Sequence, residues 1–396
     1  MFRTFARSIK QFATAMVLLL VVIVALEIML QLKSPSPAAT VTTRVTEKMQ
    51  SLLAPSSTTH HEMLRLSRWQ TTPDLKITTN SLGLRGQEPV QPKPAGALRI
   101  VILGDEAVLG PQLRTEQTVP ARLQSFLSGT TEVPVEVINA GVPGYCPLLS
   151  LLQFHQELKE LNPDLVILHF DMNDVADDAV YRRCLKDAGK RQICVNSLVT
   201  AERLAPSPAL RLVRSSALLR LLQAETGLSP QRAGTDGMAD VHERYTWTTA
   251  AKTDLRLQIQ HALTPIDHFA KVAEQNGFRF LVASTPTPWQ VASSEEFPKL
   301  AEQISTNSAW PLVEDFPFQI LDAVCERSAV PFCNAVAGFR EFSQPAKLFE
   351  EDSTTLSAYG SALYAREIAS MLLRDTKFTQ LFLQRSNVST LQRPMN

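Results

Sequence analysis

The chain has 396 residues, of which 44% are hydrophobic and 20% are charged, so it is long and apolar enough to bury a large core. Lys plus Arg and Asp plus Glu number 39 each. A formal net charge of zero gives no support for a nucleic-acid partner, which requires a basic face, and we expect no nucleic-acid binding.

The first element is an apolar run over residues 12–32, in which Glu27 is the only charge. Because about 20 helical residues span the hydrocarbon layer, this run predicts a transmembrane signal-anchor helix. Three basic residues precede it, which places residues 1–11 in the cytoplasm by the positive-inside rule. A cleaved signal peptide is the alternative, although its apolar region is usually shorter. We therefore predict a single-pass protein of the cytoplasmic membrane with a periplasmic C-terminal domain.

Residues 33–94 are expected to form an extracytoplasmic tether followed by a lead-in segment. The stretch "KSPSPAATVTT" at 33–43 is rich in Ser, Pro and Thr and cannot build a core. The later stretch "NSLGLRGQEP" at 80–89 is rich in turn-forming residues. We expect it to lie against the main domain.

From 95 to 380, apolar strands alternate with amphipathic helices. The strands are predicted at 98–103, 135–139, 164–170 and 278–284, and the helices at 120–127, 147–161, 264–276, 318–327 and 359–373. This alternation favours a three-layer α/β/α sandwich with a parallel, flavodoxin-like sheet. Residues 177–253 break the alternation as an insertion with a helix near 210–223, and 381–396 are expected to be a C-terminal tail.

Polar residues gather where the predicted strands end. Gly104, Asp105 and Glu106 follow the first strand, "NAGVPGY" at 139–145 follows the second, and "DMND" at 171–174 follows the third. A further polar stretch, "FEEDSTTLSAYG" at 349–360, precedes the last predicted helix. Ligands of open α/β sheets bind beyond the carboxyl ends of the strands, so these stretches define the expected site.

In this order and spacing the four stretches resemble the motifs of the SGNH/GDSL hydrolases, in particular a membrane-anchored bacterial branch of that family. The resemblance implies that Gly144 and Asn173 supply oxyanion-hole donors and that Asp352 belongs to the catalytic triad. It also implies ester hydrolysis or acyl transfer on an acylated sugar or cell-surface glycan. Glu106 stands where the family has its serine nucleophile, and Thr355 stands where it has its histidine base.

The two substitutions remove both the hydroxyl and the imidazole that serine hydrolysis needs, and no histidine occurs after His268. We therefore expect a catalytically degenerate esterase fold that binds an acylated glycan or a partner outside the cytoplasm. The alternative is an active hydrolase or acyltransferase with unorthodox residues, in which Glu106 acts as a general base for water. Cys146 and His169 lie close to the expected site, but we interpret both as packed core residues.

Glu106 and Asp171 add carboxylates to a pocket that already contains Asp105 and Asp174. Their repulsion must be offset by a basic side chain, a bound cation or a proton, and the sequence leaves the three open. No Cys and His spacing typical of a metal site is present, so we expect no metal and no cofactor.

Five cysteines suit an oxidising compartment. Cys184 and Cys194 flank a short polar loop, and Cys325 and Cys333 flank another short segment. The spacing predicts the disulfides Cys184–Cys194 and Cys325–Cys333 and a free Cys146.

Overall fold

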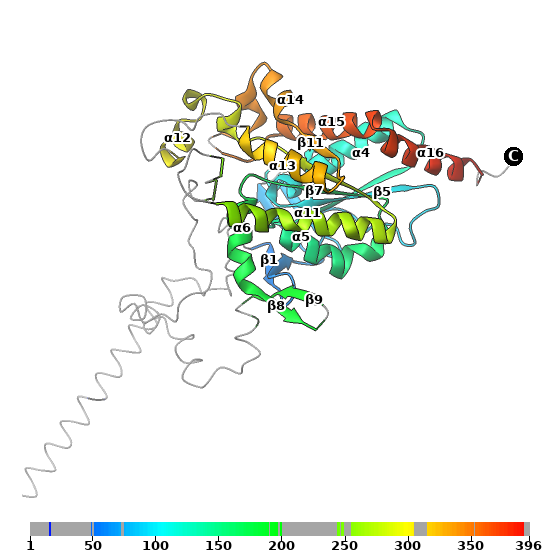
Figure 1. Ribbon diagram of the computed structural model, residues 1–396, viewed down its shortest axis with the longest axis horizontal. Coiled ribbons are helices and arrows are strands. Elements are labelled where there is room, and N and C mark those ends of the chain that lie inside the picture. Colours follow the sequence, from blue (N-terminus) through cyan, green and yellow to red (C-terminus); the bar gives the residue numbers. More distant parts are fainter. Residues whose placement is uncertain are drawn as a thin grey trace, which may run out of the picture. The chain divides into compact units, whose positions relative to one another are not determined.

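The fold is known from a computed structural model (Figure 1), which describes Met16, Met49, residues 51–72, 75–189, 191–196, Val199, 244–245, 247–248, 255–304, 315–351 and 353–391. The chain divides into two compact units. One comprises Met1–Val41 and Ser197–Thr235, and the other comprises Thr42–Asn196 and Asp236–Asn396. Almost all described residues belong to the second unit, which contains the α/β domain.

A five-stranded parallel sheet forms the centre of the α/β domain. Its strands lie in the order β6-β5-β7-β10-β11, which is 2-1-3-4-5 in chain order and therefore the flavodoxin-like arrangement. Their bounds are β5 Leu98–Gly104, β6 Val135–Gly141, β7 Leu165–His169, β10 Arg279–Ser284 and β11 Phe332–Asn334. The predicted parallel α/β sheet is confirmed.

Helices cover both faces of this sheet (Figure 1). Helices α4 and α15 pack against each other on one face, and α5, α6 and α11 pack together on the other. The bounds are α4 Val119–Thr130, α5 Pro147–Gln153, α6 Asp174–Tyr181, α11 Arg256–Asn276 and α15 Ala358–Arg374. Shorter or peripheral helices are α3 Glu106–Leu109, α12 Pro298–Ile304, α13 Phe316–Arg327, α14 Val336–Glu341 and α16 Thr376–Leu391.

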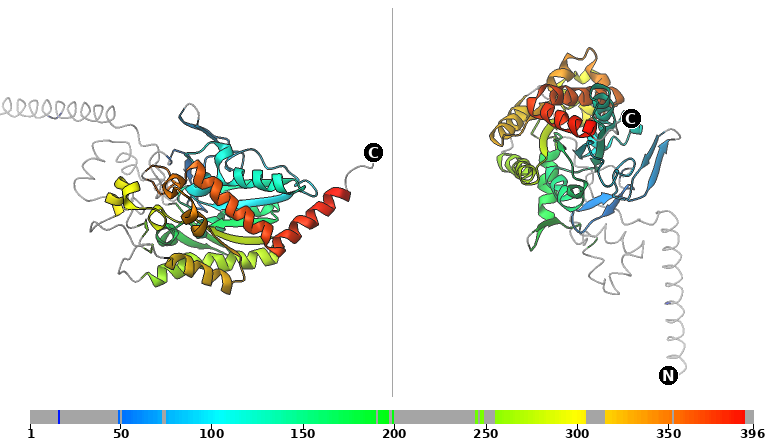
Figure 2. Two further views of the ribbon diagram at one scale, coloured as in Figure 1. Left: turned by 90° about the horizontal axis from the view of Figure 1, so that it is seen from above. Right: turned by 90° about the vertical axis from the view of Figure 1, so that its right-hand side faces the viewer.

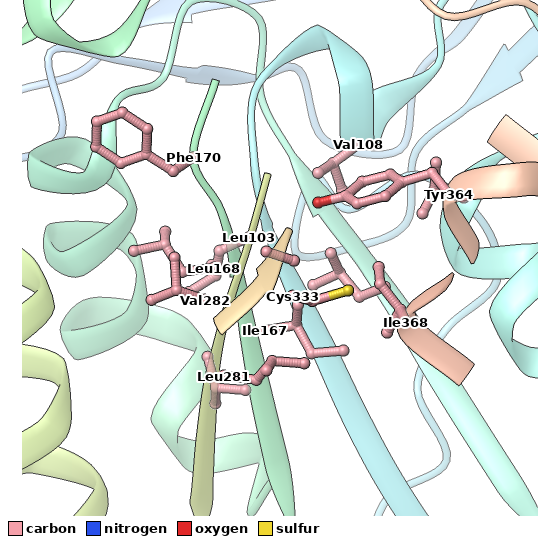
Figure 3. Close-up of a cluster of buried hydrophobic side chains, with 14 of the residues drawn as sticks. Leu103, Val108, Ile167, Leu168, Phe170, Leu281, Val282, Cys333, Tyr364 and Ile368 are labelled. Atoms are coloured by element: carbon pink, nitrogen blue, oxygen red, sulfur yellow. The ribbon is translucent and has the colours of Figure 1, made fainter. Parts of the chain in front are cut away.

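The core is apolar and tightly interleaved. Figure 3 shows side chains of β5, β7 and β10 meeting those of α15, among them Leu103, Ile167 and Ile368. Their full burial is the main source of the stability of this sheet, because each buried aliphatic side chain contributes about 1.5–3 kcal/mol.

The structure corrects several predicted boundaries. Only the first part of the helix predicted at 147–161, Pro147–Gln153, is α-helical. A π-helical turn at Phe154–Leu158 and a 3-10 turn at Lys159–Leu161 follow it. Helix α11 begins eight residues before the predicted 264, and Pro265 lies inside it rather than at its start. Proline leaves the carbonyl four residues earlier without its helical partner, and Arg182 donates a hydrogen bond of 2.8 Å to that carbonyl, on His261. The predicted C-terminal tail begins inside α16.

Strand β11 was not predicted, since three residues give no usable periodicity. The lead-in and the insertion also contain antiparallel hairpins, seen in blue and green in Figure 2. Their strands are β1 Leu53–Pro55, β2 His61–Met63, β3 Arg68–Thr72, β4 Leu75–Thr78, β8 Leu185–Ala188 and β9 Arg191–Cys194.

Five predictions fall wholly or almost wholly outside the described residues: the cytoplasmic segment 1–11, the anchor at 12–32, the tether at 33–43, the insertion helix near 210–223, and Asp352. Within the part of the chain that is described, no helix has the length and apolar character that crossing a bilayer demands.

The structure contains neither predicted disulfide, because all five cysteines are free thiols. Cys325 and Cys333 are both buried, on α13 and β11, and Cys333 packs in the core beside Ile368 (Figure 3). Cys184 and Cys194 instead face each other across the base of the β8–β9 hairpin, and side-chain hydrogen bonds from Cys194 and His60 lower the pKa of Cys184.

Candidate functional site

The polar stretches converge at the switch point of the sheet. Strand β5 pairs with β6 on one side and with β7 on the other. The connection after β5 therefore runs to one side of this strand, and the connection after β6 crosses to the other side. In sheets of this order the ligand crevice opens here, at the carboxyl ends of the first and third strands. The residues that follow β5 and β7 are therefore neighbours, as the sequence predicted for Glu106 and Asp171.

Strand β5 ends at Gly104 and turns directly into the short helix α3. A Cβ on Gly104 would lie 2.7 Å from Val108 and 2.9 Å from the Cβ of His169, so only glycine lets the turn pack this closely. The carboxylate of Asp105 caps the helix by accepting a 2.9 Å hydrogen bond from the N–H of Ala107. Glu106 is the first residue of α3.

Two buried side chains hold the far end of α3. Arg85 of the lead-in segment donates hydrogen bonds to the carbonyls of Leu109 and Gly110 at 2.7 and 2.5 Å. Asn139 of β6 donates one to the carbonyl of Val108 at 2.9 Å. Because these carbonyls would otherwise end a four-residue helix without partners, the two side chains fix the turn that presents Glu106.

The carboxylate of Glu106 is bonded to the backbone expected to form the oxyanion hole. The N–H of Gly144 donates a 3.1 Å hydrogen bond to Oε2 of Glu106. Gly144 has φ +71°, a left-handed conformation that glycine adopts without strain and that directs this N–H toward α3. The structure thus brings together the predicted nucleophile position and one predicted oxyanion donor.

The turn after β7 carries the second group of polar side chains. Asp174 accepts a 2.9 Å hydrogen bond from the N–H of Asp171 through Oδ2, and Asp171 accepts one of 2.6 Å from the N–H of Met172. Oδ1 of Asp174 and Oδ1 of Asn173 are buried and have no hydrogen-bond partner among the described residues. The amide of Asn173 has the burial expected of a site residue, but no hydrogen bond ties it to Glu106.

Four carboxyl groups crowd this place, and burial raises all of their pKa values. The pKa of Asp105 lies well above its usual range because of burial and the charge of Asp171, with which it shares a side-chain hydrogen bond. Burial likewise raises the pKa of Asp171 and of Asp174. Burial and the neighbouring Asp105 raise the pKa of Glu106 to about 8. The structure therefore brings the four predicted acidic side chains close together, and burial favours the protonated form of each.

Arg244 from the insertion faces this pocket and was not predicted. Its guanidinium donates a 3.2 Å hydrogen bond to Asp177, and its charge lowers the pKa of Glu106 and of Asp171 against the effect of burial. The nearby Trp247 fixes this part of the insertion by donating a 2.7 Å hydrogen bond to the carbonyl of Met172. A basic partner for the pocket thus comes from a segment about 70 residues further along the chain.

His169 ends β7 beneath the pocket. Its Nδ1 lies 2.8 Å from the hydroxyl of Tyr364 on α15, and its Nε2 has no hydrogen-bond partner in the described part of the chain. Burial lowers the pKa of His169 to about 3, so the ring is neutral. The position of His169 at this edge could be predicted from the sequence, but its contact with Tyr364, almost 200 residues away, could not.

The predicted base position lies in a loop that contacts both other parts of the site. Thr355 bonds only within the loop, through Ser353 at 2.9 Å. The preceding Thr354 accepts a 3.1 Å hydrogen bond from Tyr245, next to Arg244, and the carbonyl of Leu356 accepts one of 2.5 Å from the Gln112 side chain. Among its described residues, the loop therefore contacts the rest of the site through the Thr354 hydroxyl and the Leu356 carbonyl.

No model of a known protein family matches the chain, and no curated protein matches it in sequence. Solved structures do resemble its fold. The lipase/acylhydrolase from Enterococcus faecalis matches 69% of this chain over 95% of its own length, at 13% identity and a TM-score of 0.36. The acetyl xylan esterase AlAXEase matches 69% of this chain over 99% of its own length, at 12% identity and a TM-score of 0.38. A catalytic mutant of an acetylxylan esterase from Geobacillus stearothermophilus matches 70% of this chain over 94% of its own length, at 11% identity and a TM-score of 0.38.

Proposed function

We propose that the chain is an SGNH/GDSL-type domain that has lost ester hydrolysis and binds a ligand at the former active site. The proposal rests on the order of motifs in the sequence and on the chemistry of the site, where Glu106 stands at the nucleophile position and Thr355 at the base position. The ligand we favour is an acylated glycan or a partner protein outside the cytoplasm, reached by a domain that the segment 12–32 anchors in the cytoplasmic membrane.

The observation that carries this proposal is the 3.1 Å hydrogen bond from the N–H of Gly144 to the carboxylate of Glu106. An oxyanion hole stabilises the charge that develops on a substrate oxygen in the transition state, and its donors must be free to meet that oxygen. Here the chain's own carboxylate takes the donor. The residue that replaces the nucleophile thus also occupies the electrophilic part of the site.

The base position supports the same conclusion. Thr355 has no proton-accepting nitrogen, and its hydroxyl is bonded to Ser353 within the loop. His169 also lies at this edge, with Nδ1 bonded to Tyr364 and Nε2 without a hydrogen bond among the described residues. A serine introduced at position 106 would therefore receive no proton acceptor from the base loop.

The direct test is an assay of the purified full-length chain with p-nitrophenyl acetate and with a fluorophosphonate probe. We expect no turnover above background and no labelling. The double variant Glu106→Ser with Thr355→His restores a hydroxyl and an imidazole and should gain labelling and measurable turnover, while Glu106→Ser alone should not. The double variant also serves as the positive control for the probe.

Robust turnover by the wild type that Glu106→Gln abolishes would overturn the proposal and favour hydrolysis assisted by the Glu106 carboxylate. The matched control is Glu351→Gln, the same change at an exposed carboxyl in the loop before Thr355. Loss of turnover in both variants would point to a general effect on folding, which a melting curve of each variant detects.

A further inference from the structure

Three side chains at the switch point come close enough together to share one ion. A ring nitrogen of His169 and one carboxylate oxygen each of Asp105 and Asp171 all lie within 4.8 Å of one another. Asp105 and His169 are 2% exposed, and Asp171 is half-buried. Bonds of about 2.0–2.2 Å from zinc to nitrogen and oxygen place the ligands of one ion at separations of this order.

His169 gives an independent sign of a missing partner. It is almost completely buried, and its Nε2 makes no hydrogen bond within the described residues. Buried polar atoms are nearly always satisfied, so a buried imidazole nitrogen without a hydrogen bond, in a ring close to two carboxylates, calls for an explanation. In the tautomer that carries its proton on Nδ1, the ring donates to Tyr364 and presents a free lone pair on Nε2, which is the arrangement found in metal-bound histidines.

The surrounding charges favour a cation over a larger apolar or anionic ligand. Asp105, Asp171 and Asp174 are close enough for each to feel the negative charge of a neighbour, and Oδ1 of Asp174 is buried without a hydrogen-bond partner among the described residues. Arg244 faces the pocket but is hydrogen bonded to Asp177. Arg244 supplies one positive charge near Asp105, Glu106 and Asp171, and a bound cation would supply the further positive charge that this group of carboxylates needs.

We propose that Asp105, His169 and Asp171 form a binding site for a divalent transition-metal ion such as Zn²⁺. One nitrogen and two oxygen ligands suit zinc, whereas Ca²⁺ and Mg²⁺ prefer oxygen ligands alone. Sequence spacing could not reveal this site, because its ligands come from two strands that are adjacent only in the folded sheet. The site does not depend on whether ester hydrolysis is lost, since none of its three ligands is the predicted nucleophile or base.

The test measures zinc bound to the full-length chain after treatment with a chelator. The stripped protein is dialysed against a small excess of ZnCl₂ and analysed by elemental mass spectrometry, and its melting temperature is recorded with Zn²⁺ and with Mg²⁺. We expect about one zinc ion per chain and a rise in melting temperature with Zn²⁺ that Mg²⁺ does not produce. Co²⁺ should give a visible absorption band of a nitrogen- and oxygen-ligated ion.

Asp171→Asn keeps the shape of a partly exposed side chain and removes one ligand charge, and His169→Gln removes the nitrogen ligand. Each should weaken zinc binding at least about tenfold. The matched control Asp187→Asn, at an exposed carboxyl of β8, should bind zinc as the wild type does. If His169→Gln does not fold, Asp171→Asn and the Co²⁺ band of the wild type decide.

Failure of the wild type to retain zinc, or equal zinc binding by the wild type and Asp171→Asn, would overturn the proposal. Neither result would bear on ester hydrolysis, which the assays with p-nitrophenyl acetate and the fluorophosphonate measure separately.

Discussion

Two buried histidines of this domain, on β2 and β7, differ in how many of their ring nitrogens make hydrogen bonds. His61 of β2 is bonded at both ring nitrogens, since Nε2 donates to the carbonyl of Pro143 at 2.8 Å and Nδ1 lies 3.0 Å from Nδ1 of His60. His169 of β7 is bonded at one nitrogen only. Burial lowers the pKa of both rings to about 3, so both are neutral near pH 7.

This difference distinguishes a histidine with a structural role from one whose ring still has a nitrogen without a hydrogen bond among the described residues. The partners of His61 come from more than one segment of the chain, and its ring also packs edge-on against Tyr145. Such a residue is complete when the protein folds. His169 is almost as buried, yet one of its nitrogens makes no hydrogen bond among the described residues and its ring lies close to two carboxylates, a combination typical of a ligand site.

The first expected difference is in stability when each ring is replaced by an apolar side chain of similar volume. His61→Leu leaves the Pro143 carbonyl and the His60 nitrogen without their partner, and we expect a loss of about 2–4 kcal/mol in the free energy of unfolding. His169→Leu removes one hydrogen bond, and we expect a loss of about 1 kcal/mol. Urea unfolding of both variants in chelator at pH 7.5 measures this, and equal losses would remove the distinction between the two histidines.

The second expectation concerns acid. His61 titrates near 6.5 in the unfolded chain, and burial lowers its pKa to about 3 in the folded protein. Between these values the unfolded state binds the additional proton, so His61 destabilises the fold as the pH falls, by about 1.4 kcal/mol per pH unit. The groups that face it are His60, Tyr145 and Tyr181.

The stability advantage of the wild type over His61→Leu should therefore shrink as the pH falls from 6.5 toward 3. Urea unfolding of the two proteins at half-unit steps of pH measures this slope. The comparison cancels the titration of the carboxyl groups, which both proteins share. An advantage that stays constant with pH would mean that the ring takes up its proton in the folded protein.

The smallest expected effect concerns the two tyrosines that contact these histidines. Tyr145 donates a 2.7 Å hydrogen bond to the carbonyl of His61, whereas Tyr364 is bonded to the ring of His169. Each Tyr→Phe change should cost about 1 kcal/mol in stability. Tyr364→Phe alone should also weaken zinc binding about tenfold or more, because it frees the ring that it positions. Equal zinc affinities in the two variants would show that Tyr364 has no positioning role.

Much of the fold follows from local patterns, because short and largely apolar runs rich in β-branched residues, such as Leu98–Gly104, favour buried strands. The turns that end β5 and β7 could also be predicted, since glycine and acidic residues follow each run. The start of α11 could not, because Pro265 is a favourable first residue of a helix and the carbonyl that it leaves open is satisfied only by the distant Arg182.

The candidate site was predictable only where neighbouring strands supply it. Glu106, Gly144 and Asp171 follow strand ends, so the sheet order brings them together. Arg244 and Tyr364 belong to an insertion and to the last helix that covers the sheet, and their contacts with the pocket depend on tertiary packing that no local pattern encodes. The free nitrogen of His169 likewise becomes visible only when every hydrogen bond around it is known.

Arg85 has a consequence for where this domain can be cut. It is 5% exposed, and besides Leu109 and Gly110 its guanidinium donates to the carbonyl of Leu113 at 2.6 Å. A truncated chain that begins at residue 95 would keep every strand of the parallel sheet but would expose the end of α3 and loosen the turn that presents Glu106. The minimal autonomous unit of this protein must therefore start upstream of Arg85, and the lead-in segment is a working part of the site rather than a spacer.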